Sequence, residues 1–170
     1  ANPATLARQI EIPVGQRGEH SVLLRAIAFI TIDGITIKYT NTHGIQFSGC
    51  HHITVRNCKI SHGGGAWIWE DRTRYGNAVE LYGGGHDITV ENCDLAWFFD
   101  TAITNQGNNG EQYNIVYRNN RITHTKCGLE HWATGPIVVR DVLYEGNTIE
   151  DSGDNWAGNM QNVWGAVRLM

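Results

Sequence analysis

Residues 53–60 read ITVRNCKI, and residues 88–95 read nearly the same, ITVENCDL. Related stretches begin at Ile30, Ile53, Ile88, Ile115 and Val142, at intervals of 23, 35, 27 and 27 residues. A unit that recurs in this way and cannot bury its own apolar side predicts a solenoid of stacked coils. We expect the longer intervals to contain residues that loop out between strands.

A second motif keeps the same phase as the first. It reads SVLL from Ser21, GIQF from Gly44, AVEL from Ala78, AITN from Ala102, GLEH from Gly128 and AVRL from Ala166. Each unit therefore holds a strand of this second motif, a turn, an ITV-like strand, a bend and a short third strand ending in Ile or Leu. No stretch of a dozen residues has helical periodicity, and the strands are rich in β-branched residues. The sequence predicts an all-β chain, a parallel β-helix of about five to six coils with three short strands per coil.

Alternation within these strands predicts which side chains face the core. It places Ile53, Val55 and Ile60 inward. The bend falls at three asparagines in register, and we expect their side-chain amides to bond to the backbone of the neighbouring coil: Asn57, Asn92 and Asn119.

Over roughly residues 20–170 the chain resembles the right-handed parallel β-helix proteins of the pectin-lyase-like superfamily. The resemblance implies a protein that acts on polysaccharides and is secreted or displayed on a cell surface. The NTD, G-D-D and R-I-K motifs of polygalacturonases are missing, as is the paired-arginine pattern of pectate lyases. The resemblance therefore implies a fold and a broad substrate class, and no particular sugar.

Composition and charge argue against two kinds of binding partner. The chain has a net charge of −4 and no basic run, so a nucleic-acid partner is not expected. No apolar run reaches the ~20 residues of a membrane-spanning helix, so no membrane partner is expected either. We interpret residues 1–170 as a single domain, with 1–19 as an irregular or partial first coil. Strand-like residues at 166–170 leave a sheet edge uncapped, which predicts a homo-oligomer or a fragment of a longer solenoid.

Long loops and aromatic rings gather on one side of the predicted solenoid, where sugar rings could stack on indoles. The expected substrate-binding residues are Trp67, Trp69, Trp97, Trp132, Tyr82, Asn105, Gln106, Arg72, Arg74 and His124. Alternatively, the tryptophans pack loops onto the coils and His124 anchors a loop. The arginines could equally pair with Glu70 and Asp71 in their own loop.

Beside these loops, one outward column is expected to run through Gln46, Glu80, Thr104, Glu130 and Arg168. Two carboxylates with one coil between them could cooperate as acid and base in glycoside hydrolysis, for which the carboxyl separation is about 6.5–9.5 Å when the configuration inverts. Asp100 follows two Phe residues and enters the same face. The catalytic candidates are therefore Glu80, Asp100 and Glu130. Ion pairs of Glu130 with Arg168 and of Asp100 with Lys126 are the alternative interpretation.

These residues favour a glycoside hydrolase with a carbohydrate substrate. A polysaccharide lyase or epimerase is the second interpretation, and a non-catalytic glycan-binding or structural module is the third. No cofactor and no metal are expected, since neither zinc spacing nor a D-x-D calcium loop occurs. The four cysteines are expected to be free thiols, because those at 58 and 93 stack in a geometry that suits a disulfide poorly.

Overall fold

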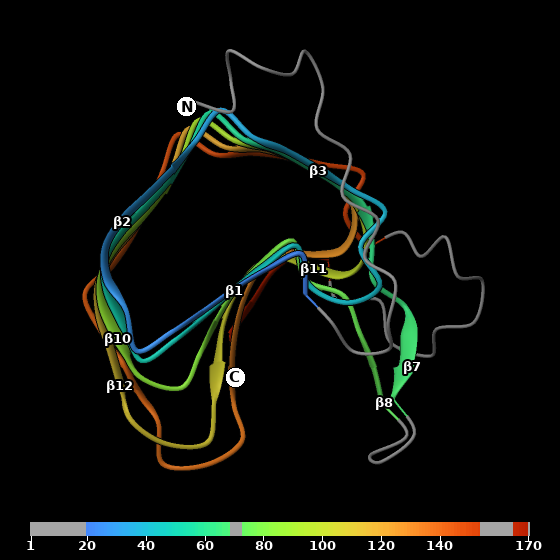
Figure 1. Cartoon of the computed structure of the whole chain (residues 1–170). Helices are drawn as coiled ribbons and strands as arrows, with labels where there is room; N and C mark the ends of the chain where they lie inside the picture. The colour runs from blue at the N-terminus through green and yellow to red at the C-terminus, as the bar shows by residue number, and fades with distance from the viewer. Residues whose placement is uncertain (1–19, 69–72, 154–164, 170) are drawn as a thin grey trace.

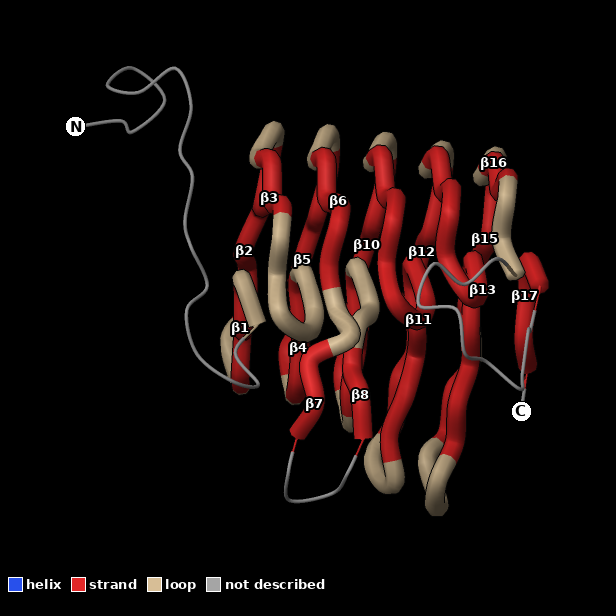
Figure 2. Tube along the Cα trace, turned by 90° about the vertical axis from the view of Figure 1, so that its right-hand side faces the viewer, coloured by secondary structure: helices blue, strands red, loops and turns tan. Residues whose placement is uncertain are grey.

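The computed structural model describes residues 20–68, 73–153 and 165–169. In these residues the chain forms strands and no helix, and the strands stack as a right-handed parallel solenoid of about four turns. Figure 1 looks along the solenoid axis, and Figure 2 shows the coils side by side. The predicted fold class is confirmed, and five to six coils is approximately right. The described part of the chain has no helix capable of crossing a membrane.

Three faces surround the core (Figure 1). The first contains β1 (Val22–Arg25), β4 (Ile45–Ser48), β9 (Val79–Tyr82), the second halves of β11 (Asp94–Gly107) and β13 (Arg121–Ala133), and β17 (Gly165–Leu169). The second contains β2 (Ala28–Asp33), β5 (Cys50–Arg56), β10 (Gly85–Glu91), β12 (Glu111–Arg118), β14 (Val138–Val139) and β15 (Val142–Glu145). The third contains β3 (Thr36–Lys38), β6 (Lys59–Gly63), the first halves of β11 and β13, and β16 (Thr148–Glu150).

Two features depart from this regular stack. Strands β11 and β13 bend from the third face into the first, and their register shifts between Phe98 and Thr101. Between β6 and β9, the strands β7 (Ala66–Ile68) and β8 (Thr73–Tyr75) form an antiparallel hairpin that projects from the solenoid (Figures 1 and 2). Both features lie next to the first face.

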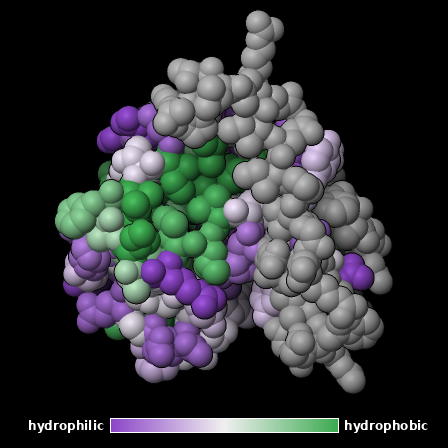
Figure 3. Space-filling model, viewed as in Figure 1, coloured by the Kyte–Doolittle hydropathy of each residue, from purple (hydrophilic) through white to green (hydrophobic). Residues whose placement is uncertain are grey.

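The repeated stretches pair in the predicted register. Ile53 of β5 lies between Ile30 of β2 and Ile88 of β10, and the column continues through Ile115 and Val142. Like side chains therefore stack inside the solenoid, and Ile53, Val55 and Ile60 are buried as predicted. Figure 3 shows apolar residues gathered in the middle of this end of the molecule, with hydrophilic residues above and below them.

The asparagines lie in register at the bend, as predicted. The side-chain hydrogen bonds to the backbone of the neighbouring coil, however, come from an asparagine that follows the bend. Asn57, Asn92 and Asn119 adopt left-handed backbone conformations, with φ of 55°, 54° and 55°. Asparagine tolerates this conformation, which explains its recurrence at the bend. The bonds to the neighbouring coil are instead made by Asn120, which accepts from the Cys93 N–H at 3.0 Å and donates to the Val90 carbonyl at 3.0 Å. Its side chain points into the core, whereas those at the bend point outward.

Candidate functional site

The predicted carboxylate column exists on the first face. Glu80 of β9 pairs in register with Gln46 of β4 and Thr104 of β11, and Thr104 pairs with Glu130 of β13. The backbone of Arg168 continues the column. The side chains at 46, 80, 104 and 130 leave the strands on the side opposite the core, because Val79 and Leu81 alternate inward.

A second column runs parallel to the first, two residues further along each strand. Tyr82, Gln106 and Trp132 are in register on β9, β11 and β13. Tyr82 is 40% exposed, and the other two are partly buried. We call the two columns together the carboxylate face: Gln46, Glu80, Thr104, Glu130, Tyr82, Gln106 and Trp132. Three of the predicted binding residues are thus brought beside two of the predicted catalytic residues.

Glu80 is buried, with 3% of its surface exposed, and both of its oxygens are hydrogen-bonded. Oε1 accepts from Gln46 Nε2 at 3.1 Å, and Oε2 accepts from Asn77 Nδ2 at 2.7 Å. His43 Nε2 lies 3.0 Å from the same Oε2. Burial raises the pKa of the Glu80 carboxyl, but His43, Asn77 and Gln46 outweigh that effect and the net pKa lies below its usual value. Glu80 is therefore ionised at neutral pH.

Asn77 organises this environment. Its backbone N–H donates to His43 Nδ1 at 3.0 Å, so Nε2 must carry the ring proton that His43 donates to Glu80. Its side-chain Oδ1 accepts from the backbone N–H of Thr101 at 3.0 Å. Asn77 thereby joins Glu80, His43 and the segment that carries Asp100.

Sequence reasoning missed His43 and Asn77, although a signal was present. The residue immediately before each second-motif strand forms a column of its own, with His20, His43, Asn77 and Thr101 in successive coils. Extending the motif by one residue would have found this polar column.

Asp100 lies at the bend of β11, where its backbone N–H donates to the Gly76 carbonyl at 2.9 Å. Its side chain is 22% exposed, and its Oδ1 lies 3.2 Å from Lys126 Nζ, which is the ion pair of the alternative interpretation. Burial raises the pKa of the Asp100 carboxyl, and the charge of Glu80 raises it further. Lys126 and His43 oppose this rise without cancelling it.

Glu130 is 2% exposed and its Oε2 accepts three hydrogen bonds. The donors are Thr101 Oγ1 at 3.2 Å, Thr104 Oγ1 at 3.2 Å and Gln106 Nε2 at 3.3 Å. The alternative interpretation pairs Glu130 with Arg168. The side chain of Arg168 lies outside the described part of the structure, so this ion pair stays a prediction. Glu130 lies on the same face as Glu80, two coils along the column, and these three donors are neutral.

Asn105 was predicted to bind substrate, but the structure places it inside the solenoid. It is 1% exposed, donates to Gln112 Oε1 at 2.8 Å and accepts from Tyr117 Oη at 3.0 Å. Between the outward residues 104 and 106, strand alternation turns it toward the core. Asn105 is therefore part of an interior polar network and is removed from the binding set.

Trp97 and His124 lie apart from the carboxylate face, at the outer corner where the third face ends. Their rings stack with centroids 3.9 Å apart and planes 14° apart. The stack continues from Trp97 to His62 at 6.0 Å, and Tyr39 lies beside His62 at 5.5 Å with its ring tilted by 45°. We call Tyr39, His62, Trp97 and His124 the aromatic ladder; it is a second outward surface that runs along the solenoid.

The remaining predicted binding residues lie on or near the β7–β8 hairpin. Arg74 is exposed on β8. Trp69 and Arg72 lie outside the described residues, and so does the side chain of Trp67. Their predicted role stays a prediction.

The fold defines the class of protein: a right-handed parallel β-helix. The sequence matches the family model described as "Right handed beta helix region" over residues 17–163, and the chain belongs to this family. No curated protein sequence matches it. Among solved structures it is similar to the tailspike protein gp49 from Pseudomonas phage LKA1, with 15% sequence identity and a TM-score of 0.48. That alignment covers 76% of this chain and 29% of the tailspike chain, so this chain spans less than a third of it.

Proposed function

We propose that this protein binds a carbohydrate on the carboxylate face and hydrolyses a glycosidic bond there. Asp100 would act as the general acid, and Glu80 as the ionised carboxylate that serves as base or nucleophile. One observation carries the proposal: Asn77 bonds both to Glu80 Oε2 and to the backbone N–H of Thr101, the residue after Asp100, so the two carboxyls are neighbours, and their pKa values are shifted in opposite directions.

Opposite shifts are what acid and base catalysis requires of two neighbouring carboxyls. A general acid must hold its proton near the working pH, whereas a base or nucleophile must have lost it. Asp100, with its raised pKa, keeps its proton to higher pH than an ordinary aspartic acid. Glu80 Oε1 accepts only one hydrogen bond among those described, which leaves a lone pair for a water or a substrate.

The neighbouring column supports a sugar as the ligand. Aromatic rings bind the apolar C–H faces of sugars, and amide groups bind their hydroxyls. Tyr82 and Trp132 supply rings one coil to either side of the Gln106 amide. A sugar chain lying along the solenoid axis would meet all three side chains next to the carboxylates.

The experiment is a hydrolysis assay on a panel of neutral and uronate-containing glycans, following new reducing ends and the absorbance of unsaturated uronates. Glu80→Gln and Asp100→Asn should each reduce the release of reducing ends by about 10²–10⁴-fold. Glu111→Gln, an exposed carboxylate paired with Arg140 on the second face, is the control and should retain wild-type activity. Circular dichroism and urea unfolding would verify that each variant is folded.

The outcomes separate the alternatives. Reducing ends that disappear in both variants support hydrolysis. Unsaturated products would instead identify a lyase, and variants with undiminished activity would exclude this site.

A non-catalytic carbohydrate-binding role is the second candidate. The near-complete burial of Glu80 and Glu130 favours it, because a buried carboxylate is harder for a substrate to reach. The aromatic ladder also offers stacked rings without an acid–base pair. Binding of a glycan without turnover, weakened by Trp132→Ala or Trp97→Ala, would support this role.

A further inference from the structure

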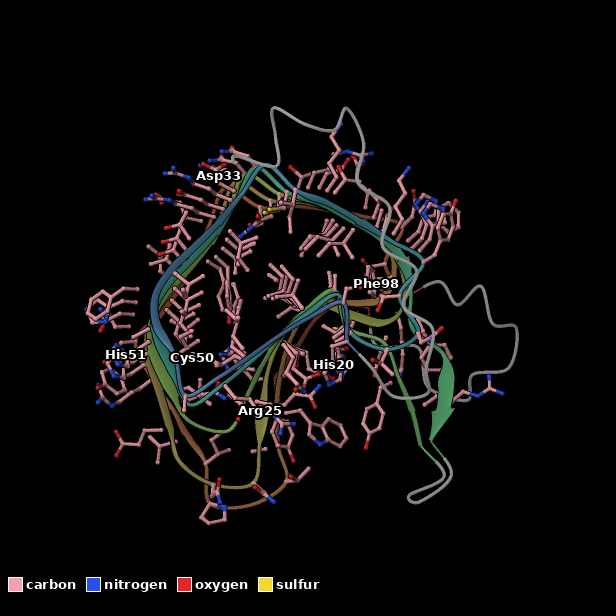
Figure 4. The ribbon with its side chains drawn as sticks, viewed as in Figure 1. His20, Arg25, Asp33, Cys50, His51 and Phe98 are labelled. Carbon is pink, nitrogen blue, oxygen red and sulfur yellow. The ribbon has the colours of Figure 1, made fainter. Side chains whose placement is uncertain are left out.

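A cluster of histidines lies on the second face, away from the carboxylate face. His51 and His52 of β5 lie beside His86 and Asp87 of β10, because His51 and His86 pair in register. Figure 4 shows His51 pointing outward from the ribbon and its neighbour Cys50 pointing into the core.

Two consecutive side chains point outward on each of these strands, which ordinary strand alternation would not allow. His52 and Asp87 both have a φ of 53°, in the left-handed region. The chain bulges at these positions and then resumes its inward alternation at Ile53 and Ile88. The bulges thus bring four polar side chains to one spot on two adjacent coils.

The donor atoms lie at separations that suit a metal ion. His52, His86 and Asp87 each offer one donor atom, and these three atoms all lie within 4.8 Å of one another. Asp87 Oδ2 is 2.7 Å from His86 Nδ1 and 3.7 Å from His52 Nδ1. Tetrahedral zinc with bonds of about 2.0–2.2 Å holds its ligand atoms about 3.3–3.6 Å apart. Small side-chain rotations would bring the three atoms to those distances.

Neighbouring groups hold the donors in place. The His86 ring stacks between His51 at 4.9 Å and Tyr113 at 4.7 Å, with planes within 3° and 8° of parallel. Asn114 Nδ2 donates to Asp87 Oδ1, which leaves Oδ2 directed at the histidines. Such outer contacts orient ligands in metal sites.

We propose that His52, His86 and Asp87 form a binding site for a divalent transition-metal ion, with Zn²⁺ as the probe. Two imidazoles and one carboxylate suit Zn²⁺ and Cu²⁺ better than Ca²⁺ or Mg²⁺, which prefer oxygen ligands. His51 Nδ1 lies 2.9 Å from His52 Nδ1, so a hydrogen bond between the two rings orients His52. The ion would connect two adjacent coils and keep a coordination position open to solvent. This site is independent of the proposed hydrolase.

Titration calorimetry with Zn²⁺ on the purified full chain tests the proposal. We expect one ion per chain at this site, with affinity reduced at least tenfold in Asp87→Asn and in His52→Asn. Asparagine tolerates the left-handed backbone at both positions, so these variants should fold. His62→Asn is the matched control, because His62 is also exposed with a φ of 56° but lies in the aromatic ladder.

The control should bind Zn²⁺ as the wild type does, and Mg²⁺ should not compete. Zn²⁺ should raise the melting temperature of the wild type and of the control, but not that of Asp87→Asn. Absence of Zn²⁺ binding by the wild type would overturn the proposal. So would affinity that is unchanged in both Asp87→Asn and His52→Asn.

Discussion

His43 Nε2 lies 3.0 Å from Glu80 Oε2, and both side chains are 3% exposed. The contact joins two successive coils, since His43 lies just before β4 and Glu80 lies on β9. Because Nδ1 of the same ring accepts the Asn77 N–H, the ring is held in one tautomer and one orientation. A buried carboxylate with such partners should be sensitive to the loss of any of them.

Replacing His43 with alanine should lower the free energy of unfolding by about 3 kcal/mol, because it removes a donor from a buried charge. Urea unfolding of His43→Ala, Glu80→Gln and the double variant forms a thermodynamic cycle. A coupling of at least ~1 kcal/mol is expected between the two positions. Additive effects would show that the pair does not interact energetically.

Lys126→Met should shift the alkaline limb of the pH–activity profile to higher pH, if the proposed hydrolysis is correct. The ammonium of Lys126 stabilises ionised Asp100, so its removal raises the pKa of Asp100 further. The general acid then keeps its proton to higher pH. Lys59→Met, an exposed lysine on the third face, should leave the profile unchanged. A limb that stays in place or moves to lower pH in Lys126→Met would contradict Asp100 as the acid.

The stability of the wild type should depend on His20 in weakly acidic solution. Burial lowers the pKa of His20 from 6.5 to about 4, with His43 and Arg25 adding to the decrease and Glu80 opposing it. The neutral ring is favoured in the folded state, so its stabilising contribution is fully present above about pH 6.5. That contribution is lost as pH falls from about 6.5 through about 4.

Urea unfolding between those pH values should therefore show a steeper loss of stability in the wild type than in His20→Gln. The difference in slope is bounded by about 1.4 kcal/mol per pH unit, and we expect less because His20 is only partly buried. Parallel slopes would exclude this contribution.

Gly44→Ala should destabilise the first face. A Cβ at this position would lie 2.6 Å from the Ala78 carbonyl oxygen and 2.6 Å from Ile60 Cγ2. Relieving the overlap requires a backbone shift that costs about 1–3 kcal/mol.

Gly34→Asn is the comparison substitution at an open position. Gly34 has a φ of 70°, a Cβ added there would have no neighbour within 4 Å, and asparagine occupies the same bend in later coils. The free energy of unfolding of Gly34→Asn should stay within about 0.5 kcal/mol of the wild-type value. Thermal and urea unfolding would rank the two variants, and equal effects would contradict the packing argument.

Tyr117→Phe should lower the free energy of unfolding by about 1–3 kcal/mol, because it leaves the buried Asn105 Oδ1 without the hydroxyl that donates to it. Tyr39→Phe is the matched control, since Tyr39 is 72% exposed and lies in the aromatic ladder. Urea unfolding should place the control within about 0.5 kcal/mol of the wild type. A similarly small effect at Tyr117 would show that the interior network adds little stability.

The sequence alone predicted the stacked coils, their register and the outward column through Glu80 and Glu130. These properties are local: a repeated strand pattern sets both the pairing of like side chains and the side on which each one lies. The alternative interpretation of Asp100 as the ion-pair partner of Lys126 followed from the same register.

Only the tertiary structure decided the partners and the exposure of these groups. It placed His43 and Asn77 around Glu80, turned Asn105 into the core, and separated Trp97 and His124 from the carboxylate face. It also bulged the chain at His52 and Asp87, so that each points outward together with the histidine before it. The physical reason is that repeats set backbone register, whereas bulges, bends and contacts between coils decide side-chain direction, hydrogen bonding and pKa.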